Sequence, residues 1–179
     1  MKRLSTTVVF LSLLFAVALS AQAQMEMPKP APELKKLDYF VGSWTMDGDM
    51  KPSPMGPGGK MGGAEQCQWM EGGYFLVSRD TFKGTMGSGT GVAYMGYSAE
   101  DKVYTYDAFS SMGEADHSKG TLDGDTWNWT SEQKMNGQMM KGHFTIKILS
   151  PTSYTFKFEM SQDGTNWNTV MEGKATKTK

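Results

Sequence analysis

From residue 42 onward, hydrophobic and polar residues alternate along the chain with a period of two. In TSYTFKFEM, for example, Tyr154, Phe156 and Phe158 share one face, whereas Thr155 and Lys157 share the other. One buried and one solvated face is typical of strands in an antiparallel sheet. Runs of this kind predict about ten strands, near residues 42–50, 61–71, 73–83, 89–98, 102–110, 113–121, 125–132, 138–149, 152–161 and 165–177.

Short turn sequences separate these predicted strands. Asp123-Gly124, Asn136-Gly137 and Asp163-Gly164 favour two-residue hairpins, because a type I′ turn needs positive φ at both central residues. Short links between neighbours favour an up-and-down meander. A ten-strand meander without covering helices would expose two edges, and closure removes both. The chain is therefore predicted to be all-β, a ten-strand antiparallel up-and-down barrel.

One helical signal precedes the strands. In PELKKLDYF, Pro32 stands at a helix-start position, and Leu34, Leu37 and Phe40 recur every three residues. A short N-terminal helix over residues 32–40 is expected.

A long connection follows the first predicted strand. The stretch KPSPMGPGGKMGG, residues 51–63, is rich in Gly and Pro, and loops of this length are often functional. It is expected to form a flap over one end of the barrel.

The beginning of the chain has the pattern of a secretory signal. Lys2 and Arg3 precede an apolar run, and an Ala-x-Ala cleavage pattern ends at Ala23. The unbroken apolar part, Val8 to Leu19, is shorter than the roughly 20 residues that span a bilayer, so no transmembrane segment is expected. The predicted organisation is a signal peptide at 1–23, a proline-rich linker at 24–31 and a single barrel domain at 32–179.

Cysteine and charge narrow the class of protein further. Cys67 is the only cysteine and cannot form an intrachain disulfide, which for a secreted chain favours a bacterial periplasm or exterior. The net charge is −1, and Arg79 is the only arginine after Ala23, so a nucleic-acid partner is excluded. Arg79 is expected either to pair at the rim with Asp80 or another acid, or to stack on an aromatic ring inside the barrel.

Several stretches carry a resemblance to a known family: PELKKLDYFVGSW, GGYFLVSRD, GYSAEDKVYTYDAFSSMGEADHSKGTLDGDTW and the closing YTFKFEM…VMEGKATK. They are similar to the domain-of-unknown-function 1579 family, secreted bacterial proteins with a calycin-like barrel. Members more often carry an acidic residue just before the SMG turn, where this chain has Ser110 and Ser111. The resemblance implies the fold and no particular activity.

Gly42-Ser43-Trp44 also resembles the Gly-x-Trp of lipocalins and nitrobindins. In those barrels the tryptophan closes the floor just after a short N-terminal helix. The resemblance implies that Trp44 has this structural role.

No catalytic constellation is found in the sequence. There is no Gly-x-Ser-x-Gly motif, and Asp116, His117 and Ser118 are strand neighbours whose side chains alternate between faces. The protein is not expected to be an enzyme.

Metal or haem binding finds little support either. The 16 methionines could bind Cu(I) through their thioethers, but most occur singly at strand positions, where methionine fills gaps. His117 and His143 are the only histidines, and neither lies in the last strands, where nitrobindins place the iron ligand. No metal and no cofactor are expected.

The remaining chemistry is aromatic. Closure of the barrel would turn the apolar face of each strand inward and leave room for one small ligand. The sequence thus predicts a secreted cell-envelope protein that binds a small apolar or aromatic molecule under the 51–63 loop. The alternative is a structural or protein-interaction module whose rings fill the barrel. The oligomeric state stays open. The candidate ligand-binding residues are Tyr104, Tyr106, Trp127, Trp129, Phe144, Phe156 and Phe158.

Overall fold

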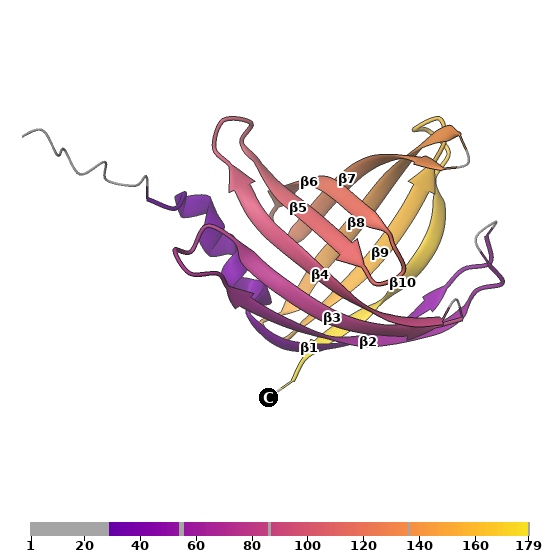
Figure 1. Ribbon diagram of the computed structural model, residues 1–179, viewed down its shortest axis with the longest axis horizontal. Helices are drawn as coiled ribbons and strands as arrows, with labels where there is room; N and C mark the ends of the chain where they lie inside the picture. The colour runs from indigo at the N-terminus through magenta and orange to yellow at the C-terminus, as the bar shows by residue number, and fades with distance from the viewer. Residues whose placement is uncertain (1–28, 54–55, 86, 136, 179) are drawn as a thin grey trace, which may run out of the picture.

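Ten antiparallel strands close into one barrel in the computed structural model, which describes residues 29–53, 56–85, 87–135 and 137–178 (Figure 1). Each strand pairs with its neighbours in sequence, and β1 pairs with β10 to close the ring. The predicted all-β meander is confirmed. The strands are β1 (Gly42–Met50), β2 (Gly59–Trp69), β3 (Leu76–Gly84), β4 (Gly87–Ser98), β5 (Val103–Ser110), β6 (Ala115–Asp123), β7 (Thr126–Met135), β8 (Gln138–Ser150), β9 (Ser153–Ser161) and β10 (Asn168–Lys177).

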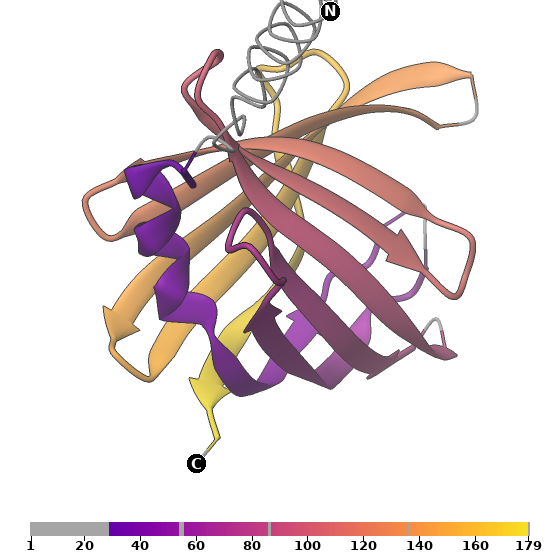
Figure 2. The same ribbon diagram turned by 60° about the vertical axis from the view of Figure 1, so that its left-hand side comes forward.

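The one helix among the described residues, η1 (Pro32–Phe40), lies across one end of the barrel (Figure 2). It is a 3₁₀ helix, in which side chains three residues apart lie directly above one another. That geometry puts Leu34, Leu37 and Phe40 on one stripe, and all three are buried. The three-residue period in the sequence therefore explains why this turn type persists well beyond its usual three or four residues. We call the end covered by η1 the floor and the opposite end the mouth.

Hydrogen bonds fix the helix to the floor. The Tyr39 hydroxyl donates to the backbone carbonyls of Ser150 and Ser153, each at 3.0 Å. The Tyr104 hydroxyl donates to the carbonyl of Glu33 at 3.1 Å. The helix is thereby held from opposite sides of the barrel.

Trp44 lies under the end of the helix and is only 1% exposed. Its indole nitrogen donates to the carbonyl of Phe40 at 2.7 Å. The Lys177 ammonium lies 5.0 Å from the centre of the Trp44 ring and donates to the carbonyl of Tyr39 at 3.2 Å. The first strand, the last strand and the helix thus meet at this one side chain.

The loop between the first two strands is shorter than the sequence predicted. Residues 59–63 were included in the predicted 51–63 flap, whose last three residues overlapped the strand predicted at 61–71, but all five form the start of β2, paired with the end of β1. Glycine is required here because strands approach closely: a Cβ on Gly63 would collide with the backbone carbonyl of Thr81. The composition that suggested a loop reflects close strand packing.

The register defines which side chains face inward, since directly paired residues point to the same side of a sheet. Near the floor these inward positions carry large buried residues. Farther toward the mouth they include small ones such as Ala108, Ser118, Ser131 and Gly142. The interior is therefore packed at one end and lined by smaller residues at the other.

Candidate functional site

The predicted aromatic row divides into two groups. Paired positions place the seven side chains on the inward face of their strands. Buried near the floor are Tyr104, Trp127, Trp129 and Phe156. Half-buried, with part of their surface accessible, are Tyr106, Phe144 and Phe158.

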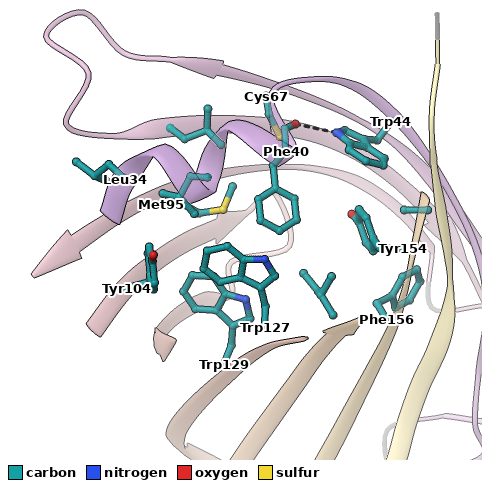
Figure 3. Packing of buried hydrophobic residues seen from close by; sticks show 14 residues of the cluster. Leu34, Phe40, Trp44, Cys67, Met95, Tyr104, Trp127, Trp129, Tyr154 and Phe156 are labelled. Atoms are coloured by element: carbon teal, nitrogen blue, oxygen red, sulfur yellow. Dashed lines mark hydrogen bonds between the residues drawn. The ribbon is translucent and has the colours of Figure 1, made fainter. Parts of the chain in front are cut away.

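The floor group forms a packed aromatic core (Figure 3). Trp127 and Trp129 stack with ring centres 5.8 Å apart and planes 7° from parallel. Tyr104 meets Trp127 edge-on at 4.7 Å, and Phe40 of the helix lies 5.6 Å from the same ring. These rings hold the helix in place and leave little room between them.

The remaining rings lie along the barrel wall. A Cβ on Gly142 would lie 3.1 Å from the Phe158 ring, and a Cβ on Gly89 would lie 2.5 Å from the Phe82 ring. Inward-facing glycines therefore accept rings from nearby strands flat against the sheet. Aromatic side chains placed this way lie close to the wall of the barrel.

We call the interior between floor and mouth the lumen, as defined by Glu65, Asp80, Tyr106, Phe144 and Phe158. These five side chains point inward yet stay half-buried, so accessible space reaches them. The lumen has an aromatic side and an acidic side.

The acidic side begins with a carboxyl pair on neighbouring strands. Glu65 and Asp80 are direct partners in the β2–β3 register. The Ser78 hydroxyl donates a hydrogen bond to the Glu65 carboxyl. The Asp80 carboxyl lies over Gly91, where a Cβ would collide with it. Burial raises the pKa of both carboxyls, and the charge of Asp80 adds to the shift of Glu65.

A third carboxyl faces the lumen from β6. Asp116 accepts a hydrogen bond from the Ser118 hydroxyl at 2.7 Å. The hydroxyl pKa of Tyr106, on β5, is raised mainly by burial. The charges of Glu65, Asp80 and Asp116 raise it further. The phenol thus stays protonated and available as a hydrogen-bond donor.

The thiol of Cys67 sits beside this acidic side and is buried. Burial, followed by the charge of Glu65, raises the pKa of the Cys67 thiol. A protonated thiol is a poor nucleophile. Cys67 is therefore a packing residue.

Both histidines point away from the lumen. His117 Nδ1 lies 2.7 Å from a carboxyl oxygen of Asp107 on the outer face. His143 lies against Trp167, with ring centres 5.7 Å apart. Among the residues that the structure describes, no group of three or more His, Cys, Asp and Glu side chains is arranged to hold a metal ion.

Arg79 also faces outward. Asp80, its neighbour in β3, points inward, so the expected Arg79–Asp80 pair does not form. Strand alternation is the reason, since consecutive side chains point to opposite faces. Because Arg79 is exposed, the alternative of a stacked arginine inside the barrel is wrong as well.

A surface groove of about 890 Å³ crosses the outer face of β8, β9, β10, β1 and β2. Most of its lining side chains point away from the lumen, and many are charged. Ion pairs engage several of these charges: Lys60 pairs with Asp49 at 2.8 Å, and Glu172 pairs with Lys51, which lies outside the groove, at 2.5 Å. Solvated charge pairs of this kind offer a ligand little that water does not.

The raised carboxyl pKa values predict how stability depends on pH. A group whose pKa is higher in the folded than in the unfolded state stabilises the fold below its unfolded pKa, and this contribution is lost as pH rises through the folded pKa. Glu65→Gln should therefore be more stable relative to the wild type at pH 7.5 than at pH 4, by about 1.4 kcal/mol per unit of pKa displacement. Urea unfolding of both proteins at both pH values measures this difference.

Glu100→Gln provides the control, because this carboxyl is exposed in the turn that follows β4. Its stability difference from the wild type should change little between pH 4 and pH 7.5. Equal pH dependence in Glu65→Gln and the wild type would contradict an uncompensated acid in the lumen.

Sequence reasoning missed the acidic side of the lumen. Glu65, Ser78 and Asp80 were not among the candidate residues, because the prediction rested on the apolar members of each alternating run. The signal was present: Glu65 alternates in phase with Cys67, and Asp80 with Leu76. A carboxyl at an inward-facing strand position indicates either a polar site inside the barrel or a free-energy cost for burying the charge.

Fold and interior together define a closed antiparallel β-barrel protein with a helix across its floor and a partly polar lumen. Within that class, residues 29–177 match the model of a family described as "Protein of unknown function (DUF1579)", and the chain belongs to this family. No curated protein sequence matches the chain.

Solved structures with a similar fold include the crystal structure of Rv2717c from M. tuberculosis. The two share 12% sequence identity with a TM-score of 0.59, over 84% of this chain and 100% of the other. At this identity the likeness concerns the fold alone. In the described part of the chain, no helix is both long and apolar enough to cross a membrane.

Proposed function

We propose that this protein is a small-molecule binding protein of the cell envelope, which holds an apolar or aromatic ligand inside its barrel. The proposal rests on the partial exposure of three inward-facing rings, those of Tyr106, Phe144 and Phe158. Each ring points inward but keeps accessible surface. Aromatic side chains without packing partners on one face favour an apolar ligand.

The envelope location rests on the signal-like segment at 1–23, which lies outside the described residues. Binding is favoured over catalysis because the lumen acids lack a reactive neighbour: the nearby Cys67 thiol is held protonated, and both histidines face outward.

One test blocks the lumen without touching the floor. Ala108 faces inward and is half-buried, whereas Ala115 on the next strand is exposed. Ala108→Trp should abolish saturable binding of the neutral dye N-phenyl-1-naphthylamine, because the indole would occupy the space of the dye. Ala115→Trp makes the same chemical change outside the barrel and should leave binding within about twofold. Dye fluorescence titration gives both dissociation constants, and circular dichroism checks that each variant is folded.

The second candidate is a structural or protein-interaction module whose aromatic rings fill the barrel. The packed floor favours it. Exposed apolar side chains near the mouth, Phe109, Met112 and Met139, would suit a protein partner. If the dye fails to saturate the wild type, or if Ala108→Trp binds it unchanged, this second candidate replaces the first.

A further inference from the structure

The lumen holds acids without a compensating base. Glu65, Asp80 and Asp116 face inward. Within the described strands, Lys177 is the only basic residue at an inward-facing position, and it is committed to the Tyr39 carbonyl and the Trp44 ring at the floor. Buried carboxyls are usually paired, so this arrangement is costly in the free protein.

One deeply buried donor has no partner. Trp127 is fully buried, and its indole nitrogen makes no hydrogen bond with any described residue. The indole points into the interior, as does Tyr154, which is 4% exposed (Figure 3). Buried donors are satisfied in almost all native proteins, so the Trp127 nitrogen indicates an absent partner.

The Tyr154 hydroxyl and the acids belong to one region. Glu65 is the direct partner of Trp44 in the β1–β2 register, and the Tyr154 ring lies 5.0 Å from the Trp44 ring. After burial, the charge of Glu65 raises the pKa of Tyr154, as it does for Tyr106. Carboxyls and phenols therefore face the same space. A molecule placed there would meet both acceptors and donors.

An inorganic cation does not fit this arrangement, because the acids do not converge as metal ligands do among the described residues. Glu65 and Asp80 lie on β2 and β3, whereas Asp116 lies on β6. An extended organic molecule can bridge such separated groups. Its apolar body would lie on the aromatic side, against Phe144 and Phe158.

We propose that the lumen selects a small organic cation, an aromatic or apolar molecule whose protonated amine is bound by Glu65 and Asp80. This inference rests on the proposed binding function and adds the charge of the ligand. A charge-assisted hydrogen bond from the ammonium would satisfy the carboxyl that burial leaves uncompensated. The neighbouring phenols then donate to whichever acceptor the ligand carries.

Three naphthalene probes of equal shape test the charge: 1-naphthylmethylamine, 1-naphthalenemethanol and 1-naphthoate. Isothermal titration calorimetry at pH 7.5 should show the amine binding about tenfold or more tightly than the alcohol, as one charge-assisted hydrogen bond predicts. The naphthoate should bind most weakly, because its charge repels the acids.

Variants that remove one carboxyl at a time then test which residues cause the preference for the amine over the alcohol. Asp80→Asn should cut the amine's advantage over the alcohol to about twofold or less, and Glu65→Gln should do the same. Asp80→Asn keeps the test available should Glu65→Gln fold poorly. Asp107→Asn removes a carboxyl from the outer face and should keep the full advantage.

Outcomes separate this inference from the function on which it rests. Saturable binding of all three probes with equal affinity, or tightest binding of naphthoate, would overturn the cation preference and leave a lumen that binds apolar molecules. An amine preference that survives in both lumen variants would also overturn it. If no probe binds and Ala108→Trp changes nothing, the binding function fails, and the cation inference fails with it.

Discussion

Trp44→Ala should lose about 3–5 kcal/mol of unfolding free energy, the range for removing a large buried aromatic side chain. The loss is expected to fall in the upper part of that range, because Trp44 connects three elements. Its indole donates to Phe40 of the helix, its ring contacts Tyr154 on β9 at 5.0 Å, and Lys177 of β10 lies over its face. Urea unfolding followed by circular dichroism measures the change.

Two further variants separate the parts of this effect. Trp44→Phe keeps a ring but removes the hydrogen bond to the Phe40 carbonyl, and should cost less than the alanine variant while still losing the roughly 1 kcal/mol of one hydrogen bond. Trp167→Ala serves as control, since Trp167 is 38% exposed in a loop, and should change stability by under about 1 kcal/mol. Comparable losses at Trp44 and Trp167 would show that the floor does not depend on Trp44.

Gly173→Ala should destabilise the barrel by about 3 kcal/mol, the upper end of the range for overpacking. Gly173 on β10 faces Gly48 on β1 at the seam that closes the barrel. A Cβ on Gly173 would lie under 3.0 Å from the Asp47 carbonyl, the Gly48 Cα and the Phe156 ring. Two of these atoms belong to backbone, which cannot move aside without parting the strands.

Gly84→Ala is the matched control. A Cβ there would lie 3.5 Å from the Cβ of Met61, which is ordinary contact, and Gly84 does not have positive φ. We expect a neutral effect or a gain of about 0.4–1 kcal/mol, because alanine restricts the unfolded chain. Thermal unfolding of both variants measures the contrast. Equal effects at the two positions would contradict close packing at the seam.

Alternation predicted the barrel well because it reports burial directly. Tyr154, Phe156 and Phe158 lie inward, as their phase in the sequence required. The helix lies at its predicted residues. The three-residue spacing of Leu34, Leu37 and Phe40 matches the three residues per turn of a 3₁₀ helix. Local spacing sufficed for these elements, since each depends on neighbours along the chain.

The site was harder to predict because it depends on contacts between strands. The sequence does not show that Phe158 lies over Gly142, or that Asp80 lies over Gly91, so the space left in the lumen could not be judged. The same limit applies to 59–63, where glycine composition suggested a loop and close packing of β2 produced a strand. A glycine-rich sequence is compatible with a loop and with a closely packed strand, and only the position of the partner strand distinguishes the two.

Barrel closure ties the order of folding to the order of the chain. Nine of the strand pairings join neighbours in sequence and can form as local hairpins, but the β1–β10 pairing joins residues as distant as Trp44 and Lys177. Such a contact has a high entropic cost and forms slowly. Until β10 arrives, β1 and β9 each keep an open edge that another chain can pair with. A chain in which β10 has not yet paired is therefore an aggregation-prone intermediate. Rapid pairing of β1 with β10 would shorten the time for which these edges are exposed.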